Sequence, residues 1–136
     1  MSKAIPKIQK YMTTVPICIG RTDTIAEAHK VMRAHDIRHL PVVEGEKLAG
    51  IVTQRDLHLI ETLKDVDAEK VTVEDAMTTN LYTVSPDAPL DEVVAEMAEQ
   101  KYGSAVVVQN HRVVGVFTTI DAMLAFSDLL KSRLVH

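Results

Sequence analysis

The chain has 136 residues, 46% of them hydrophobic and 25% charged, with a formal net charge of −4 at pH 7. This length suits one ordinary domain, the composition is typical of a soluble globular protein, and the acidic balance argues against a general nucleic-acid binder. The single Cys18 excludes an internal disulfide and fits a reducing cytoplasm. We recognise neither a signal peptide nor an apolar run of the ~20 residues that span a bilayer, so we expect a cytoplasmic protein without membrane segments.

The first part of the chain predicts a strand, a helix and a hairpin. Residues 15–19 form a short β-rich segment after a turn at residues 12–14. A helix follows, because apolar residues recur at helical spacing; these are Ile25, Ala28 and Met32. Thr24 and Glu27 have the spacing of a capping box at its start. Residues 40–43 and 48–53 then predict two buried strands joined by a polar turn.

A second helix begins near Asp56, and a charged segment leads to a second set of the same elements. Residues 81–84 predict a strand, and a helix follows at Leu90, Val93 and Met97. Residues 105–108 and 113–118 repeat the hairpin, and a last helix begins near Asp121. An apolar stripe on this helix either covers the module's own sheet or pairs with a second copy; it consists of Met123, Leu124, Phe126, Leu129, Leu130 and Leu134.

The second set is a copy of the first. When the sequence is shifted by 65 positions, the separation of Met12 from Met77, residues 50–56 fall on residues 115–121 without a gap. A period of this length seen only twice favours two small units that share one core, each with the order β-α-β-β-α. Such a pair would enclose a cleft lined by the recurring residues. The recurring methionines are interpreted as core packing; they are Met12, Met32, Met77 and Met97.

The pattern Thr-x-x-Asp follows a predicted strand and opens a predicted helix in both copies, as Thr53 with Asp56 and as Thr118 with Asp121. One interpretation is structural, since a threonine followed three residues later by an acid resembles a helix cap. The other is a ligand site, because a helix N-terminus can hold a phosphate and a neighbouring carboxylate can accept from both hydroxyls of a ribose. The spacing alone favours the cap, and the doubling of the pattern strengthens the ligand interpretation.

The tandem pattern M-T-T, L-P-V-V and G-I-V-T-x-x-D resembles a cystathionine-β-synthase-type (CBS) domain pair, also called a Bateman module. The resemblance extends over about residues 8 to 126. It implies a mixed α/β (α+β) fold in which two β-α-β-β-α repeats pack in a pseudo-two-fold arrangement with two clefts between them. We expect the repeats at residues 8–62 and 74–127, a linker at 63–73 and the end of a C-terminal helix at 128–136.

The resemblance also implies what the clefts bind, which in this family is commonly an adenosine compound. The aspartate of the motif would bind ribose, and the threonine would contact ribose or phosphate. By the family's pattern, one cleft would contain Asp121, Thr118, Val15, Ile17, Ile37, Arg38 and His39. The other would contain Asp56, Thr53, Tyr82, Lys101, Tyr102 and Ser104.

The Asp121 cleft is expected to bind more strongly, because of the two residues before the first hairpin. Arg38 carries a permanent charge and a planar donor fork suited to phosphate oxygens, and His39 can supply a second donor. The alternative is an exposed, solvated Arg38 beside a partly buried His39.

The Asp56 cleft is expected to be weaker or empty. The residues that match Arg38 and His39 in the second copy are Gly103 and Ser104, which leaves only Lys101 nearby. Tyr102 could pack on an adenine face, and the alternative is a tyrosine of the core or of a dimer interface.

Other kinds of site find little support. His29, His35 and His39 do not share one helical face, so no metal site is expected. The acidic run that starts at Asp65 is more simply a solvated linker than a calcium loop, since Lys70 stands where a glycine is needed. No nucleophile paired with a base, Walker loop or dinucleotide fingerprint is found, so no catalytic residue is expected.

We therefore expect a non-catalytic regulatory module that binds an adenine nucleotide such as AMP, ADP or ATP, without a required cofactor. It would signal energy or metabolite state to an unknown effector protein in trans. A homodimer, built as a flat disc of two modules, is expected by resemblance, and nucleic acid is not an expected partner. The alternatives are a structural or dimerising module without ligand, a sensor of S-adenosylmethionine, NAD or a cyclic dinucleotide, and an enzyme acting on nucleotides.

Overall fold

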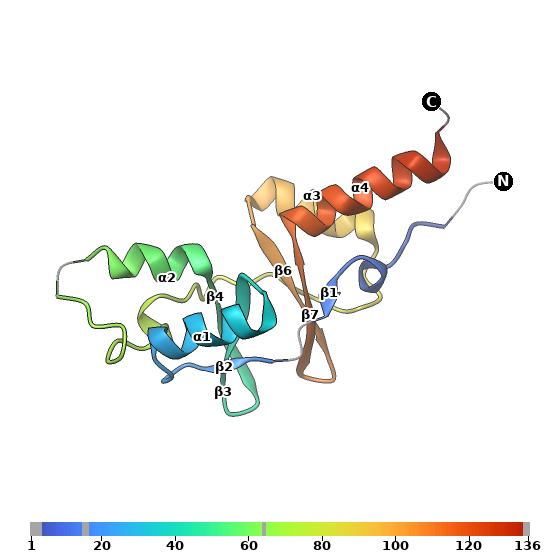
Figure 1. Ribbon diagram of the computed structural model, residues 1–136. Helices are drawn as coiled ribbons and strands as arrows, with labels where there is room; N and C mark the ends of the chain where they lie inside the picture. The colour runs from blue at the N-terminus through green and yellow to red at the C-terminus, as the bar shows by residue number, and fades with distance from the viewer. Residues whose placement is uncertain (1–3, 15–16, 64, 135–136) are drawn as a thin grey trace. The chain divides into compact units, whose positions relative to one another are not determined.

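The structure, a computed structural model, describes residues 4–14, 17–63 and 65–134. It contains two compact units: unit 1 comprises residues 1–14 and 82–136, and unit 2 comprises residues 15–81. The chain therefore leaves unit 1 directly after Thr14 and returns to it after Leu81. Both units are mixed α/β, as predicted, and both contain the order β-α-β-β-α (Figure 1).

Unit 2 holds a three-stranded sheet in the order β2-β3-β4 and two helices. β2 runs parallel to β3, and β3 runs antiparallel to β4. The elements are β2 (Ile19–Gly20), α1 (Ile25–His35), β3 (His39–Glu44), β4 (Lys47–Thr53), α2 (Gln54–Glu61) and the 3-10 turn η2 (Val73–Asp75). The core consists of Ile19, Ile25, Ala28, Met32, Leu40, Val42, Val52, Leu57 and Val73.

Unit 1 holds a four-stranded sheet in the order β1-β7-β6-β5 and two helices. Only the β5–β6 pair is parallel in this described sheet. The elements are the 3-10 turn η1 (Ile8–Lys10), β1 (Thr13–Thr14), β5 (Thr83–Val84), α3 (Leu90–Gln100), β6 (Ser104–Gln109), β7 (Arg112–Thr118) and α4 (Thr119–Arg133). The core consists of Ile8, Leu90, Val93, Met97, Ala105, Val107, Phe117 and Ala125.

The two hairpins and the first helix follow from local sequence, as predicted. The hydroxyl of Thr24 accepts from the backbone N–H of Glu27 at 3.1 Å and so caps α1. Gly45, in the β3–β4 turn, has φ +63°. Asn110 and His111, in the β6–β7 turn, have φ +52° and +65°, the conformation that two-residue hairpin turns require.

The predicted turn at residues 12–14 is wrong, because these residues take part in a sheet. Thr13 and Thr14 form β1, which pairs antiparallel with β7 at Val116 and Gly115. Pairing with a strand about one hundred residues away satisfies backbone groups that a local turn would have to satisfy within itself. The matching residue of the second copy, Thr78, forms a bridge to Ile51 in unit 2.

The start of each copy therefore packs with the other copy. Ile8 belongs to the core of unit 1, and Val73, the residue 65 positions later, belongs to the core of unit 2. The compact units consequently divide the chain at other places than the sequence repeat does, and the repeat boundaries stay a prediction from the sequence.

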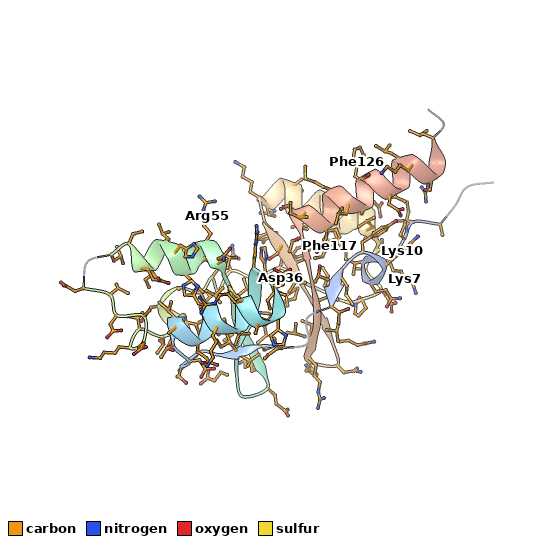
Figure 2. All side chains as sticks on the ribbon, in the orientation of Figure 1. Lys7, Lys10, Asp36, Arg55, Phe117 and Phe126 are labelled. Atoms are coloured by element: carbon orange, nitrogen blue, oxygen red, sulfur yellow. The ribbon has the colours of Figure 1, made fainter. Side chains whose placement is uncertain are left out.

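Two further details differ from the prediction. The strand expected at residues 15–19 begins only at Ile19, while Val15 lies outside the described residues. The apolar stripe of α4 is mostly exposed, and of its members only Leu129 packs against the core of unit 1. Phe117 on β7 is fully buried, whereas Phe126 on α4 is 65% exposed; both are labelled in Figure 2.

The recurring methionines are core packing, as predicted. Met32 and Met97 are buried, and Met12 and Met77 are partly buried against the cores of unit 1 and unit 2 respectively. Within the described ranges, no helix has the length and apolar character needed to cross a membrane.

Candidate ligand-binding site

Both Thr-x-x-Asp motifs form capping boxes, one at the start of α2 and one at the start of α4. In α2, the carboxylate of Asp56 accepts from the backbone N–H of Thr53 at 3.0 Å, and the Thr53 hydroxyl accepts from the Asp56 N–H at 3.1 Å. Thr118 and Asp121 repeat the pair of bonds in α4, at 2.9 Å and 3.2 Å. The structural interpretation of the motif is thus confirmed. The cap also fixes each carboxylate at the positive end of a helix dipole.

The carboxylate of Asp121 is enclosed by hydroxyl groups as well. Asp121 is 8% exposed and is the buried charged residue of the described core. Besides the cap, it accepts from the Thr118 hydroxyl at 3.2 Å and from the Thr13 hydroxyl, which lies 3.0 Å from Oδ1 and 3.2 Å from Oδ2. Thr13 reaches this position because its partner in the β1–β7 pairing is Val116, two residues before Thr118.

The carboxylate of Asp56 is more open. Asp56 is only partly buried, and among the described residues its carboxylate accepts from Thr53 alone. A cavity of about 350 Å³ adjoins it within unit 2. The lining residues are Asp56, Leu59, Ile60, Thr62, Leu63, Asp75 and Ala76. The cavity thus combines two carboxylates with an apolar wall, which suits an uncharged or cationic group better than an anion.

The loop before the first hairpin lies beside the first motif. His39 is the Cα partner of Thr53 in the β3–β4 pairing, and the carbonyl of Arg38 accepts from the Gln54 N–H at 2.9 Å. Arg38 is exposed and His39 is partly buried. Ile37 packs against the core of unit 2 together with Ile17.

The second copy repeats this arrangement in unit 1. Ser104 is the Cα partner of Thr118, and the carbonyl of Gly103 accepts from the Thr119 N–H at 3.2 Å. The structure therefore brings His39 to Thr53 and Ser104 to Thr118. Asp121 lies in unit 1 and Arg38 in unit 2, and likewise Asp56 and Tyr82 lie in different units. The two mixed clefts stay predictions that rest on the resemblance.

Two predicted aromatic residues contact each other. The rings of Tyr82 and Tyr102 stack at 5.3 Å with 17° between their planes, and both pack against the core of unit 1. Burial raises the pKa of the Tyr82 hydroxyl, and the nearby carboxylates of Glu96 and Glu92 add to the effect. These contacts favour the interpretation of Tyr102 as a packing residue. Lys101, at the left-handed C-cap of α3, is exposed.

Sequence reasoning missed Thr13 and Asp75 as residues of these sites. The recurrence of M-T-T before each repeat was a signal for Thr13, but only the β1–β7 pairing places its hydroxyl on Asp121. No sequence pattern singles out Asp75, and it lies against the cavity at Asp56 because η2 packs beside the core of unit 2.

His29 and His58 make ordinary contacts. His29 on α1 contacts the carboxylate of Glu61 on α2, and its ring stacks on that of His58 at 5.3 Å. In the part of the chain that the structure describes, no group of three or more His, Cys, Asp or Glu residues is arranged to hold a metal ion.

A second cavity, of about 740 Å³, lies within unit 1 between the N-terminal segment, α3 and α4. Its apolar wall includes Ile5, Met123, Phe126 and Leu130, and its charged lining residues are Asp91, Lys131 and Arg133. It is separate from the capping boxes and mostly apolar, which is typical of a surface that binds another protein chain.

The comparison with known families gives the same two copies. The model of the CBS domain matches residues 8–59 and 73–128. L-aspartate semialdehyde sulfurtransferase of Methanocaldococcus jannaschii is 34% identical over 128 residues, which cover 93% of this chain. The chain spans 24% of the length of that relative.

Two solved structures resemble nearly the whole chain. AcuB of Vibrio cholerae, named for acetoin utilization, is 32% identical with a TM-score of 0.78, and the match covers 98% of this chain and 100% of that one. A CBS domain pair solved in complex with 5′-methylthioadenosine and S-adenosyl-L-methionine is 31% identical with a TM-score of 0.80. That match covers 93% of this chain and 99% of the other.

Proposed function

The chain belongs to the CBS domain family, and from this premise we propose that it is a non-catalytic regulatory module that binds an adenosine-containing ligand. The observation that carries the proposal is the pair of carboxylates, Asp56 and Asp121, each fixed at a helix start in its own unit. A similar domain pair binds 5′-methylthioadenosine and S-adenosyl-L-methionine. Both of these ligands carry a ribose, and a carboxylate can accept hydrogen bonds from its two hydroxyls.

The ligand favoured by the charged residues is an adenine nucleotide. Arg38 is exposed, and its guanidinium donor fork is suited to phosphate oxygens. In the proposal, Arg38 and His39 contact the phosphates of a ligand whose ribose meets Asp121 and Thr118. Thr53 and Asp56 bind the ribose of a second ligand, with Tyr82, Lys101, Tyr102 and Ser104 as further contacts.

The regulatory output goes to a partner protein in trans. A ligand shifts an equilibrium between two conformations only when it binds one of them more tightly. The carboxylates lie at the starts of α2 and α4, so a ligand there acts directly on the ends of two helices. No bound cofactor is needed for this output, and a reducing cytoplasm suits the free Cys18.

The module also forms a homodimer in this proposal, through the exposed apolar face of α4. Met123, Phe126 and Leu130 are exposed beside the larger cavity of unit 1, whose charged residues include both signs. A two-fold interface brings the same surface together with itself, so it must be self-complementary. An apolar surface whose lining residues include both Asp91 and Lys131 meets that requirement.

Ligand-induced stabilisation tests the main proposal. The purified protein is heated with AMP, ADP, ATP, NAD, S-adenosylmethionine or 5′-methylthioadenosine, as wild type and as Asp56→Ala, Asp121→Ala and the double variant. A ligand that binds only the folded state at one hundred times its dissociation constant stabilises it by about 2.7 kcal/mol. We expect the double variant to lose the shift, whereas Glu99→Ala, which removes an exposed carboxylate of α3, keeps it. Absence of a shift with every ligand, on folded protein, would favour a dimerising module without ligand.

A second candidate is a sensor of S-adenosylmethionine, favoured by the acidic cavity beside Asp56 and by the ligands of the similar domain pair. Its sulfonium is a cation, whereas the nucleotides carry anionic phosphates. Arg38→Gln separates the two candidates, because it should weaken ADP binding and leave S-adenosylmethionine binding unchanged. Binding of S-adenosylmethionine that Arg38→Gln leaves unchanged, with no binding of any nucleotide by wild type, would select the second candidate.

A further inference from the structure

The two capping boxes contain the same two hydrogen bonds, but the number of hydroxyl groups that donate to the carboxylate differs. Thr13 pairs with Val116, and Thr78, its counterpart 65 residues later, bridges to the matching Ile51. The Thr13 hydroxyl donates to Asp121 at 3.0 Å. Among the described residues, Thr78 makes no such bond to Asp56, although its backbone exchanges two bonds with Ile51, at 2.8 Å and 3.0 Å.

We infer that Thr13 competes with the ligand's ribose hydroxyls for the Asp121 carboxylate, so that the Asp56 site fills first. The inference rests on the proposed function, and it adds a residue that determines the relative affinity of the two sites. It also reverses the ranking that the sequence suggests from the phosphate donors Arg38 and His39.

The two carboxylates differ in the number of acceptor positions that are already used. A carboxylate offers about four lone-pair sites. At Asp121, the Thr118 N–H, the Thr118 hydroxyl and the Thr13 hydroxyl all donate to it. At Asp56, the one donor among the described residues is the Thr53 N–H. A ribose diol that brings two hydroxyl donors finds room at Asp56. At Asp121 it exceeds the four positions and must displace one donor, and the Thr13 hydroxyl is the donor that does not belong to the capping box.

The surroundings of the two carboxylates differ in the same direction. The Tyr11 hydroxyl donates to Asp128 at 2.6 Å and so links the N-terminal segment to α4. The residues of unit 2 at the matching positions are Ala76 and Leu63, which cannot form this bond and instead line the cavity beside Asp56. A cavity therefore lies beside α2 in unit 2, whereas the matching place beside α4 in unit 1 is occupied by the bond between Tyr11 and Asp128.

Thr13 also occupies a special place in the chain. It is the last residue but one of the first part of unit 1, after which the chain passes into unit 2. A ligand that displaces its hydroxyl from Asp121 removes a side-chain bond between β1 and α4 at that point. Occupancy of the Asp121 site would thus act on the segment in which the chain leaves unit 1.

The test measures the affinity of each site separately by calorimetry, with ADP and 5′-methylthioadenosine as probes. Asp56→Ala leaves only the Asp121 site, and Asp121→Ala leaves only the Asp56 site. We expect the Asp56 site to bind more tightly. We also expect Thr13→Val, made in the Asp56→Ala protein, to raise affinity at the Asp121 site by about three- to tenfold, since one net hydrogen bond no longer has to be broken.

Two control variants show whether the effect comes from the hydroxyl group of Thr13. Thr13→Ser retains the hydroxyl and should leave the affinity of the Asp121 site as it was. Thr78→Val, made in the Asp121→Ala protein, should leave the affinity of the Asp56 site as it was. Thermal unfolding without ligand shows whether each variant is folded.

The outcomes separate this inference from the proposed function. If neither probe binds the wild-type protein, the proposed function fails and the inference fails with it. If the probes bind but Thr13→Val weakens the Asp121 site or leaves it unchanged, the competition is wrong while the proposed function stands. A tighter Asp121 site than Asp56 site in the single variants would likewise overturn the order of filling.

Discussion

Thr14 and Gly115 are Cα partners in the antiparallel pairing of β1 with β7, and β1 approaches β7 closely at this point. A Cβ added to Gly115 would lie 2.8 Å from the sulfur of Met12 and 2.8 Å from the carbonyl oxygen of Thr13. Gly50 repeats the relationship in unit 2, at the same distances from the sulfur of Met77 and the carbonyl oxygen of Thr78. The recurring glycine is therefore required by the close approach of the Met-Thr segment of the other copy.

Replacing either glycine should destabilise its unit. Since a backbone oxygen cannot move away as a flexible side chain can, we expect Gly115→Ala and Gly50→Ala each to cost about 1–3 kcal/mol in urea unfolding. Gly103→Ala is the control, because its added Cβ would meet no atom within 4 Å. Equal stability of all three variants would show that the close approach does not hold in solution.

The N-terminal segment should contribute strongly to stability through Ile8. Its side chain is fully buried in the core of unit 1, so Ile8→Ala should cost about 2–5 kcal/mol in the free energy of unfolding. The neighbouring Ile5 is 50% exposed, and Ile5→Ala should change stability by less than about 0.5 kcal/mol. A small effect of Ile8→Ala would contradict the assignment of the segment to that core.

The bond between Tyr11 and Asp128 predicts a pH dependence at the alkaline end. Accepting this bond, the Asp128 carboxylate raises the pKa of the Tyr11 hydroxyl, with burial as a further cause. The folded protein thus holds this proton more tightly than the unfolded chain. The stability from the bond is fully present below the ordinary tyrosine pKa of about 10, and it is lost as pH rises through the raised pKa.

Tyr11→Phe measures this contribution. Because Asp128 is exposed and Tyr11 is only partly buried, we expect the variant to lose less than about 1 kcal/mol at pH 8. We expect the difference from wild type to vanish or change sign in strongly alkaline solution. Urea unfolding at pH 8 and near pH 11 checks both. Asp128→Asn, which removes the charge, should lower the pKa of Tyr11 in a spectrophotometric titration.

The single cysteine should react slowly in the folded protein. Burial raises the pKa of the Cys18 thiol, so less thiolate is present at mildly alkaline pH than for a free cysteine. Alkylation followed by mass spectrometry should show a lower rate in buffer than in denaturant, with a pH profile displaced to higher pH. Equal rates in the two solutions would mean that the thiol is not buried.

The exposed face of α4 should control assembly. Phe126→Asp places a charge in the apolar surface proposed for a second copy, and light scattering should then report a monomer where wild type is a dimer. Ala98→Asp, which changes an exposed residue of α3, is the matched control and should leave the mass unchanged. A monomeric wild-type protein would remove the basis for the proposed homodimer.

The sequence by itself determined the mixed α/β class, the duplication, the two hairpins and the capping boxes. Each of these depends on residues close together in the chain. Thr53 and Asp56 stand three positions apart, and so do Thr118 and Asp121, so one helical turn is enough to bring each pair together. The family followed from the same recurring motifs.

Only the tertiary structure decided that the start of each copy packs against the other copy. Thr13 and Asp121 are separated by 108 positions, and their bond depends on the register of β1 with β7, which no local pattern specifies. For the same reason, the sequence assigned residues 12–14 to a turn and did not distinguish the enclosed Asp121 from the more open Asp56. Periodicity likewise found the apolar stripe of α4, but whether a helix face is buried depends on what packs against it, and here most of that stripe is exposed.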